Sequence, residues 1–404
     1  MAYSVYLKKG EERRLLAGHS WVYANEAAKI EGDGGNGSLA SVYAHDGRFI
    51  GKGYINHLSK ILVRIFLRGE GEDDDAFYCK KIAEANALRE RLVGGDNYRM
   101  VFGEADGLPA LIADRYGDCI VLECLSLGVD KRKERIAGCF AKLFSPRCVY
   151  MRGTAPVRRK EGLPLEDKLL YGELPEELTM TENGLTLGVD IQNGQKTGFF
   201  LDQKENRLAL RRYAAGGRVL DCFCNSGGFS LNAALVAKEV VANDISESAL
   251  EVLRQNAARN GLTNIRTVQG DAFDLLRKLR ADGEQFDCVV LDPPAFCKSA
   301  AEVPGAYRGY RDINVSAMKL VKRGGFLLTC SCSHYMTPPL FEKMLRESAQ
   351  HAGREARLLE ARAGARPPDF TRRRRNGVSE SVLFASELIH EISFKRDERN
   401  FRDW

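Results

Sequence analysis

The chain has 404 residues, which is enough for two or three domains. Hydrophobic residues make up 44% and charged residues 28%, as in a soluble globular protein, and no apolar run approaches the roughly 20 residues that span a bilayer. The N-terminus has no apolar signal-peptide core, so we expect a cytoplasmic protein without a membrane partner. The net charge of +5 is too small to indicate nucleic-acid binding by itself.

The 11 cysteines do not point to disulfides or to a metal site. An odd number cannot pair fully within one chain, and the cytoplasm is reducing. Two C-x-C pairs occur, Cys222/Cys224 and Cys330/Cys332, but there is no C-x-x-C pair and no second histidine at zinc spacing from His334. We therefore expect no bound metal and interpret most thiols as small buried hydrophobic groups.

Residues 1 to about 70 have the pattern of a small β-barrel. Short apolar runs at 41–44, 49–55 and 61–66 follow glycine-rich turns. The acidic stretch 70–75 is interpreted as a linker, and a helix is expected near 76–92. This region predicts a separate N-terminal domain.

Residues 98–188 mix strands, at 119–124 and 148–151, with a basic helix near 131–143. Positive side chains cluster here and could face phosphates, although an ordinary solvated surface explains each cluster equally well. These side chains are Lys131, Arg132, Lys133, Arg152, Arg158, Arg159 and Lys160.

From about residue 189 the pattern changes to alternating buried strands and helices, which predicts a parallel α/β sheet. The strand 218–221 ends in Asp221 and leads into the glycine-containing turn 222–230, and a helix follows at 231–237. Such a turn places backbone N–H groups beside a bound nucleoside. Because the turn is not G-x-G-x-x-G, a dinucleotide site is disfavoured.

Further carboxylates follow the next two strands. Asp244 ends the strand 239–243, where it can accept hydrogen bonds from both ribose hydroxyls, and Ser246 is expected to cap the helix that Gly261 stops. Asp271 follows the strand 265–269 and could accept from an adenine amine. Each aspartate alone is better explained as a loop cap, but three at successive strand ends favour a nucleoside site.

The last two predicted strands bring a carboxylate and thiols to the same edge of the sheet. Asp292 opens a rigid Asp-Pro-Pro turn after the strand 287–291, and the strand 324–329 leads to residues 330–333. Methylation of pyrimidine carbon-5 needs a thiolate that adds to carbon-6 and a carboxylate near the base. Cys332 and Asp292 could meet these needs on an unpaired or flipped-out base. Cys330 and Cys297 are competing nucleophiles, and the pattern alone does not choose among them.

The distinctive motif is residues 190–207, Asp-Ile-Gln-Asn-Gly-Gln-Lys-Thr-Gly-Phe-Phe-Leu-Asp-Gln-Lys-Glu-Asn-Arg. It resembles the signature of the RlmI-type large-subunit rRNA cytosine-C5 methyltransferases. Residues 219–229, 292–299 and 328–333 also resemble motifs of that family. Residues 18–26 are similar to the opening of its PUA domain, a small RNA-binding barrel, and 104–109 to its middle domain. The resemblance covers roughly residues 1–365.

The resemblance implies a class I SAM-methyltransferase Rossmann-like α/β domain at 189–365, a PUA-like domain at 1–70 and an α+β middle domain at 76–188. It implies S-adenosylmethionine as the cofactor, large-subunit rRNA as the partner, Cys332 as the nucleophile and Asp292 beside it. A homodimer is one candidate assembly. The residues expected around the cofactor are Gln195, Lys196, Thr197, Gly198, Phe199, Asp221, Cys222, Phe223, Gly227, Asp244, Ile245, Asp271, Ala272, Asp292 and Pro293.

The C-terminus departs from the family pattern. An Asp-His-Pro segment and a Glu-Thr/Ser-x-Tyr-Leu-Lys segment are expected, but the basic stretch 366–375 stands there instead. A one-base shift of the reading frame permits both missing segments, so our hypothesis is that residues after about 365 are a frameshifted translation. In that case the sheet lacks its last strand, and the arginine run does not bind RNA. The alternative is a genuine basic tail over 366–404.

Three other functions remain in view. An amino-methyltransferase acting on another nucleic acid or on protein often carries an aromatic residue directly after Asp/Asn-Pro-Pro, where Ala295 stands here. A non-catalytic RNA-binding assembly factor is compatible with the N-terminal domain, but the cofactor residues and Cys332 argue against it. A nicotinamide dehydrogenase is disfavoured by the glycine spacing.

Overall fold

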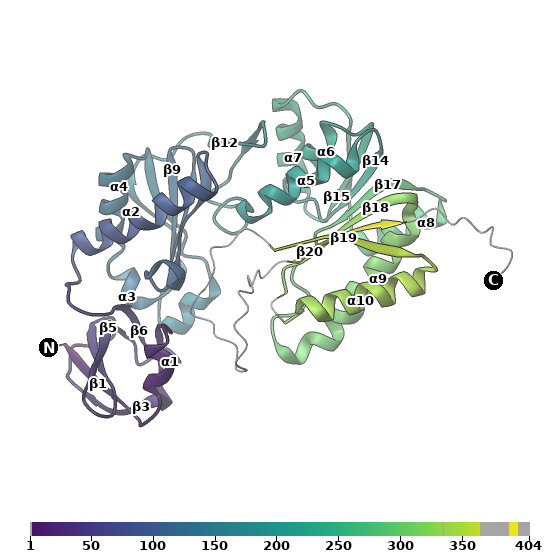
Figure 1. Ribbon diagram of the computed structural model, residues 1–404. Coiled ribbons are helices and arrows are strands. Elements are labelled where there is room, and N and C mark those ends of the chain that lie inside the picture. Colours follow the sequence, from purple (N-terminus) through teal and green to yellow (C-terminus); the bar gives the residue numbers. More distant parts are fainter. Residues whose placement is uncertain (1, 334, 364–387, 395–404) are drawn as a thin grey trace. The chain divides into compact units, whose positions relative to one another are not determined.

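Figure 1 shows the computed structural model, which describes residues 2–333, 335–363 and 388–394. The described chain forms two compact units: residues 2–181 and 189–201 make the first, and residues 182–188, 202–333, 335–363 and 388–394 make the second. None of the helices in these ranges combines the length and the apolar character that a bilayer crossing needs.

The first unit begins with a six-stranded sheet in the order β2-β6-β5-β4-β1-β3. Its elements are β1 (Tyr3–Leu7), α1 (Glu12–Leu16), β2 (Trp21–Tyr23), η1 (Ala24–Glu26), β3 (Ala27–Glu31), β4 (Leu39–Tyr43), β5 (Phe49–Ile55) and β6 (Ile61–Leu67). Only β1 and β4 pair in parallel in this sheet, and alternate side chains such as Val5, Val42 and Ile65 are buried in its core. The strands expected at 49–55 and 61–66 are confirmed as β5 and β6.

A five-stranded sheet follows in the same unit, in the order β11-β10-β9-β8-β7. Its elements are α2 (Asp75–Leu92), β7 (Asn97–Phe102), η2 (Gly103–Asp106), β8 (Leu111–Tyr116), β9 (Cys119–Cys124), α3 (Leu127–Asp130), α4 (Lys133–Phe144), β10 (Cys148–Met151), η3 (Pro156–Glu161) and β11 (Lys168–Gly172). Buried residues of α2 and α4 share one core with this sheet. The helices expected near 76–92 and 131–143, and the strands at 119–124 and 148–151, are confirmed.

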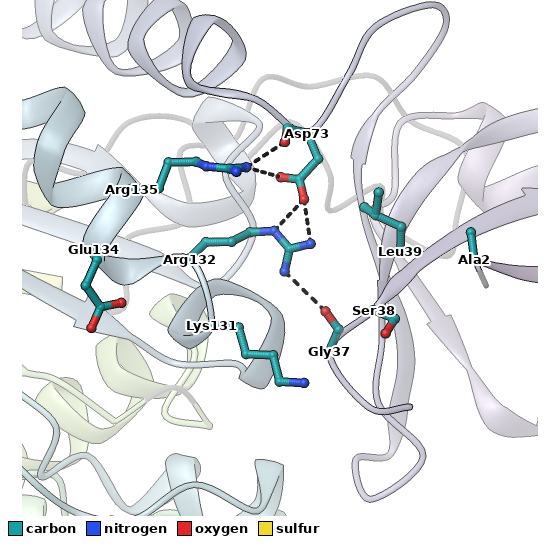
Figure 2. Close-up of a pocket in the computed structure, with 9 residues that line it drawn as sticks. All are labelled: Ala2, Gly37, Ser38, Leu39, Asp73, Lys131, Arg132, Glu134 and Arg135. Carbon is teal, nitrogen blue, oxygen red and sulfur yellow. Dashed lines mark hydrogen bonds and ion pairs between the residues drawn. The ribbon is translucent and has the colours of Figure 1, made fainter. Parts of the chain in front are cut away.

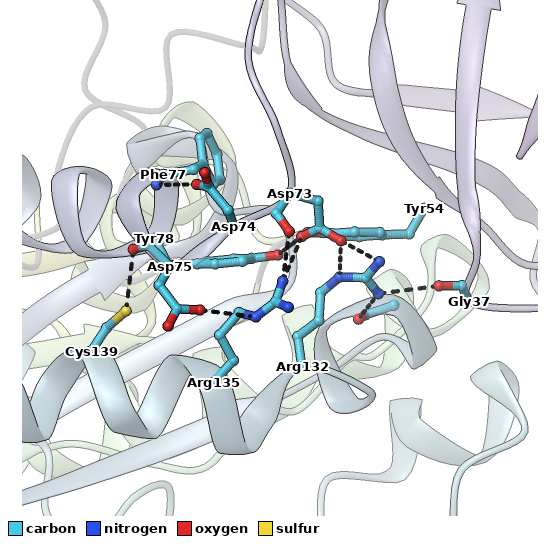
Figure 3. A network of polar contacts seen from close by, with 11 residues as sticks. Gly37, Tyr54, Asp73, Asp74, Asp75, Phe77, Tyr78, Arg132, Arg135 and Cys139 are labelled. Carbon is cyan, nitrogen blue, oxygen red and sulfur yellow. Dashed lines mark hydrogen bonds and ion pairs between the residues drawn. The ribbon is translucent and has the colours of Figure 1, made fainter.

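The acidic stretch 70–75 is more than a solvated linker. Figure 3 shows Asp73 at the centre of a polar network, where it accepts hydrogen bonds from Tyr78, at 2.7 Å, and from Arg132, at 2.6 Å. The Arg132 guanidinium lies over the Tyr54 ring, 4.1 Å from its centroid. Burial alone would raise the pKa of Asp73, but the hydrogen bonds and positive charges from Arg132 and its neighbours lower it. The network joins β5 to α2 and α4 within the first unit.

Most of the basic residues expected to face phosphates are engaged inside the first unit instead. A pocket of about 600 Å³ in this unit is lined in part by Arg132 and Arg135. Figure 2 shows that both side chains reach Asp73 and that Arg132 also donates to the Gly37 carbonyl. Lys133 pairs with Asp130 at 2.9 Å. The same aspartate pairs with Arg158, which is fully buried.

The buried Arg152 donates to the Gly194 carbonyl at 2.7 Å, and Lys131 donates to the Asn36 carbonyl at 2.7 Å. The expectation of phosphate contacts is therefore wrong for Arg152 and Arg158, because both are buried. For the partly exposed Arg132 and Lys133 it stays a prediction. Arg159 and Lys160 are exposed.

After a short hairpin of β12 (Thr179–Glu182) and β13 (Leu185–Gly188), the second unit forms a seven-stranded sheet in the order β16-β15-β14-β17-β18-β20-β19. The strands are β14 (Arg218–Cys222), β15 (Glu239–Asp244), β16 (Ile265–Gln269), β17 (Phe286–Leu291), β18 (Val321–Ser331), β19 (Ala356–Ala363) and β20 (Leu388–Phe394). The helices are η4 (Leu201–Gln203), α5 (Lys204–Ala214), α6 (Gly228–Ala234), α7 (Glu247–Arg259), α8 (Ala272–Ala281), η5 (Ala300–Glu302), α9 (Val303–Leu320) and α10 (Pro338–Ala352).

The strands β14 to β18 pair in parallel, as the buried apolar runs predict. Ser246 caps α7 by accepting from Ala249 N, and Gly261 with φ +65° follows the end of that helix, as expected. Figure 1 shows helices on both sides of this sheet.

The strand that the frameshift hypothesis would remove from the sheet is present. β20 lies between β18 and β19 and pairs antiparallel with both, with Leu328 opposite Glu391. Its sequence is rich in apolar and β-branched residues, which favours a strand in this position. The arginine run at 366–375 lies outside the described residues, so the frameshift hypothesis itself stays a prediction.

Candidate active site

The candidate active site lies at the carboxyl ends of the parallel strands of the second unit. The strand order reverses there, because β14 pairs with β15 on one side and with β17 on the other. Open α/β sheets bind ligands at such a switch point. The four expected aspartates, at 221, 244, 271 and 292, lie at or just after the ends of β14, β15, β16 and β17. The second unit therefore brings them to one edge of its sheet.

The turn after β14 has an unusual backbone. Phe223 and Asn225 have φ of +65° and +48°, and Gly227 has φ of +89°. The left-handed region is costly for a phenylalanine and tends to persist at ligand sites, where the surroundings enforce it. A Cβ atom on Gly227 would lie 2.5 Å from Cγ of Leu253, so this position requires glycine. The Cys222 side chain is fully buried, which leaves its backbone for ligand contact.

Asp221 carries the most perturbed carboxyl group at this edge. It is fully buried, its Oδ2 accepts from Ser230 Oγ at 2.5 Å, and its Oδ1 has no hydrogen-bond partner. Burial raises the pKa of Asp221 to about 7, and the negative charges of Asp292 and Asp244 add to the rise. An uncompensated buried oxygen at this edge favours a cationic ligand nearby.

Asp244 is held in a fixed orientation by the backbone. Its Oδ2 accepts from Asn225 N and its Oδ1 from Ser246 N, each at 2.9 Å. Each carboxylate oxygen can accept a further bond, so both remain able to bind a diol. The next residue, Ile245, is 71% exposed. This arrangement suits a nucleoside. The oriented carboxylate can bind the ribose hydroxyls, and the exposed apolar side chain can pack against the nucleobase.

Asp271 has a helix-capping role. Its Oδ1 accepts from Phe273 N at 2.8 Å and from Asp274 N at 3.2 Å, at the start of α8. Ala272, the first residue of that helix, is 3% exposed. The cap interpretation is confirmed, and the adenine contact stays a prediction.

The turn after β17 meets the segment after β18. These strands are parallel neighbours, with Leu291 opposite Thr329. Cys332 Sγ donates to the carbonyl oxygen of Pro293 across 3.7 Å. The expected closeness of Cys332 to the Asp-Pro-Pro turn that begins at Asp292 is therefore present.

The structure separates the three candidate nucleophiles by their exposure. Cys330 is 0% exposed and packs with the core residues of the sheet, and Cys297 is 2% exposed. Cys332 is partly exposed. A buried thiol cannot reach a base, so the geometry favours Cys332.

The expected cofactor segment 195–199 belongs to the first unit and is described there by itself. Thr197 is fully buried and donates to Asp114 Oδ2 at 2.6 Å, and the hydroxyl of Tyr116 lies 2.8 Å from its Oγ1. Lys196 has φ of +54° and its Nζ lies 4.3 Å from the Phe200 ring centroid. Thr197 thus anchors the segment to β8 and leaves other atoms of the segment for any ligand.

In the same segment, Gln195 is exposed and Phe199 is 5% exposed. Gly198 has φ of +132°, and a Cβ there would lie 2.9 Å from Cγ1 of Val189. The cofactor roles of these residues stay predictions.

Comparison with known proteins identifies the family. A PUA-like domain model matches residues 5–68, and an S-adenosylmethionine-dependent methyltransferase model matches residues 165–376. Proteins named Ribosomal RNA large subunit methyltransferase I from Aeromonas hydrophila subsp. hydrophila, Shewanella amazonensis and Escherichia coli O139:H28 are 41%, 42% and 39% identical to this chain. Each alignment covers 89% of the chain and 93% of the relative. The chain belongs to the ribosomal RNA large subunit methyltransferase I family.

Solved structures agree on the fold of this family member. A protein from Streptococcus mutans assigned as a SAM-dependent methyltransferase has a TM-score of 0.77 and 19% identity, over 97% of this chain and 100% of its own. A structure of an assigned methyltransferase in complex with SAH matches equally well. The predicted combination of a PUA-like domain with a Rossmann-like methyltransferase domain is confirmed, and the cofactor is S-adenosylmethionine.

The residues of the second unit fit this cofactor. S-adenosylmethionine carries an ammonium and a sulfonium cation, and the orphaned Oδ1 of Asp221 together with the nearby charges of Asp244 and Asp292 provides negative potential for cations. Asp244 and Ile245 provide a diol acceptor and an apolar contact. The part of the chain that the structure describes contains no cluster of three or more His, Cys, Asp or Glu side chains arranged to hold a metal ion.

Sequence reasoning missed several supporting residues. Ser230 donates a hydrogen bond to Asp221. The hydroxyl groups of Tyr310 and Ser333 interact next to Cys332 in the chain. The buried Arg207 of α5 forms an ion pair with the buried Glu182. Ser230 lies within the turn motif and could have been found as a hydroxyl aimed back at the strand. Tyr310 gives no such signal, because it lies on the apolar face of a helix.

Proposed function

We propose that this chain forms 5-methylcytidine in large-subunit rRNA through a thiolate adduct of Cys332. The observation that carries the proposal is the partly exposed Cys332, in contact with the Asp-Pro-Pro turn at the edge where the strand order reverses. The names of the curated relatives and the PUA-like domain support ribosomal RNA as the substrate.

Cytosine carbon-5 is a weak nucleophile, and the proposed role of Cys332 is to activate it. The Sγ thiolate adds to carbon-6, which makes carbon-5 electron-rich. When bound, S-adenosylmethionine would supply the electrophilic methyl group that carbon-5 takes, with S-adenosylhomocysteine as the leaving group. Carbon-5 then loses its proton to a base, the carbon–sulfur bond breaks, and the thiolate of Cys332 is restored. The target cytosine must be unpaired or flipped out of a duplex to reach the thiol.

The other residues are assigned binding roles in this proposal. Asp244 binds the ribose hydroxyls of the cofactor, and Ile245 packs on its adenine. The cationic end of the cofactor favours the ionised form of Asp221, which then contributes negative potential. Asp292 orients the cytosine edge beside Cys332. The turn from Cys222 to Gly227 completes the cofactor contacts within the second unit.

The test is methyl transfer from tritiated S-adenosylmethionine to unmodified large-subunit rRNA, followed by nucleoside analysis. We expect labelled 5-methylcytidine with the wild type, no label with Cys332→Ala, and a normal product with Cys330→Ala. Label on an exocyclic amine or on protein would indicate an amino-methyltransferase. Cofactor and RNA binding without any transfer would indicate a non-catalytic assembly factor.

A further inference from the structure

Tyr310 is fully buried beside the segment that carries Cys332, and the scheme above gives it no role. It lies on α9, and its ring packs on Phe296 with 4.5 Å between the centroids. Phe341 of α10 contacts the same ring edge-on, at 5.6 Å. Phe296 follows the Asp-Pro-Pro turn, so the Tyr310 ring rests against the segment that begins at Asp292.

The hydroxyl group of Tyr310 meets the other segment of the site. Its oxygen lies 2.9 Å from Ser333 Oγ, and it also interacts with the Ser331 side chain. Both serines are 2% exposed, whereas Cys332 between them is partly exposed. Tyr310 therefore holds the segment by the two buried serines that flank the thiol.

Tyr310 is suited to hold a neighbour and not to exchange a proton. Burial raises the pKa of Tyr310 to about 12, although its hydrogen bonds to Ser331 and Ser333 act in the opposite direction. The hydroxyl thus stays neutral through the physiological range. Ser333 Oγ extends the connection, because Cys297 N donates to it at 3.4 Å.

We propose that Tyr310 is a positioning residue for Cys332. Through Ser333 it fixes the segment 331–333 to the segment after the Asp-Pro-Pro turn, which holds Sγ beside the Pro293 carbonyl. Small displacements of a reacting group are costly, so this contact contributes to turnover without touching the substrate. The inference rests on the proposed role of Cys332 as the nucleophile.

The substitution Tyr310→Phe keeps the aromatic packing and removes only the hydroxyl group, and Ser333→Ala removes its partner. We expect each variant to lower kcat for RNA methylation by about tenfold, the usual scale for one buried hydrogen bond, with KM for S-adenosylmethionine unchanged. Since the two residues share the Tyr310–Ser333 contact, the loss of kcat in the double variant should be smaller than the product of the two single losses. The control is Tyr98→Phe, which removes a buried hydroxyl that donates to Asn86 at 2.9 Å in the first unit, and it should keep the wild-type kcat.

A second readout needs no RNA. The rate at which iodoacetamide alkylates Cys332 in the full chain, followed by peptide mass spectrometry, should rise at least about threefold in Tyr310→Phe and in Ser333→Ala, because Sγ is no longer held at Pro293. Tyr98→Phe should not change it. If the wild type proves not to methylate cytosine, the proposed function fails, and the alkylation rates alone decide the positioning role. Wild-type alkylation in Tyr310→Phe, or losses of kcat that add in the double variant, would overturn it.

Discussion

The Sγ atom of Cys332 lies 3.7 Å from the carbonyl oxygen of Pro293. This contact joins the segment after β18 to the turn after β17, beside the point where the strand order of the sheet reverses. A nucleophile there can approach a ligand bound at the strand ends, because both lie at the same edge of one sheet.

Replacing Ile245 by alanine should weaken cofactor binding without destabilising the protein. The side chain is 71% exposed in the chain alone, so its loss should change the free energy of unfolding by no more than about 0.5 kcal/mol. Covering it with adenine is worth about 1.5 kcal/mol, or roughly a tenfold rise in Kd when it is removed. Calorimetric titration with S-adenosylmethionine measures this, with Leu235→Ala, another exposed apolar residue, as the control. An unchanged Kd would remove Ile245 from the site.

The buried carboxyl group of Asp221 should make stability depend on pH. Its folded pKa of about 7 lies above the ordinary value of about 3.9, so the folded state keeps a proton that the unfolded state releases. Stability should therefore fall as the pH rises from about 4 to 7. The substitution Asp221→Asn retains an acceptor for Ser230 and should abolish this pH dependence. At pH 8 the free energy of unfolding of the variant should exceed that of the wild type by about 4 kcal/mol at most.

Urea unfolding of the cofactor-free protein at pH 5 and pH 8 checks this prediction. The exposed Asp46 provides the matched control, and Asp46→Asn should behave as the wild type at both values. An Asp221→Asn variant with the same pH dependence as the wild type would show that this carboxyl group is ionised in the folded protein.

Asp73 should be a stabilising residue although it lies in an acidic connecting stretch. Asp73→Ala leaves the Arg132 guanidinium without its carboxylate over Tyr54, and breaking such a pair costs about 3 kcal/mol. The lowered pKa of Asp73 implies that the difference from the wild type shrinks as the pH falls below about 4. Thermal unfolding measures the loss. Glu247→Ala, which breaks an exposed ion pair with Arg254, should change stability little, and an equal loss in both variants would contradict the role of the network.

The sequence predicted the strand ends well because each parallel strand is an apolar run that stops at a polar residue. Asp221, Asp244 and Asp292 were located in this way, and so was the cap of α7 at Ser246. These features are local, and each is visible within about ten residues of the chain.

Features that depend on distant partners were missed. Arg158 is separated by 34 residues from the Cys124 carbonyl that it contacts, and Arg132 by 59 residues from Asp73, so neither partner is visible in the local sequence. The local sequence therefore predicts solvent-exposed positive charges at both positions. Exposure also distinguishes Cys332 from Cys330, and the burial of Cys330 depends on how α5 and α6 pack against the sheet. The domain boundaries and the homodimer stay predictions.

The most direct test of the account is to trap the covalent adduct. An RNA fragment carrying 5-fluorocytidine cannot lose a proton from carbon-5, so the enzyme should remain attached after methyl transfer. We predict a protein–RNA band that survives denaturing electrophoresis and that requires S-adenosylmethionine for its methylated form. The band should appear with Cys330→Ala and be absent with Cys332→Ala. A band that persists in Cys332→Ala, or label transferred to RNA without any adduct, would contradict the central role of Cys332.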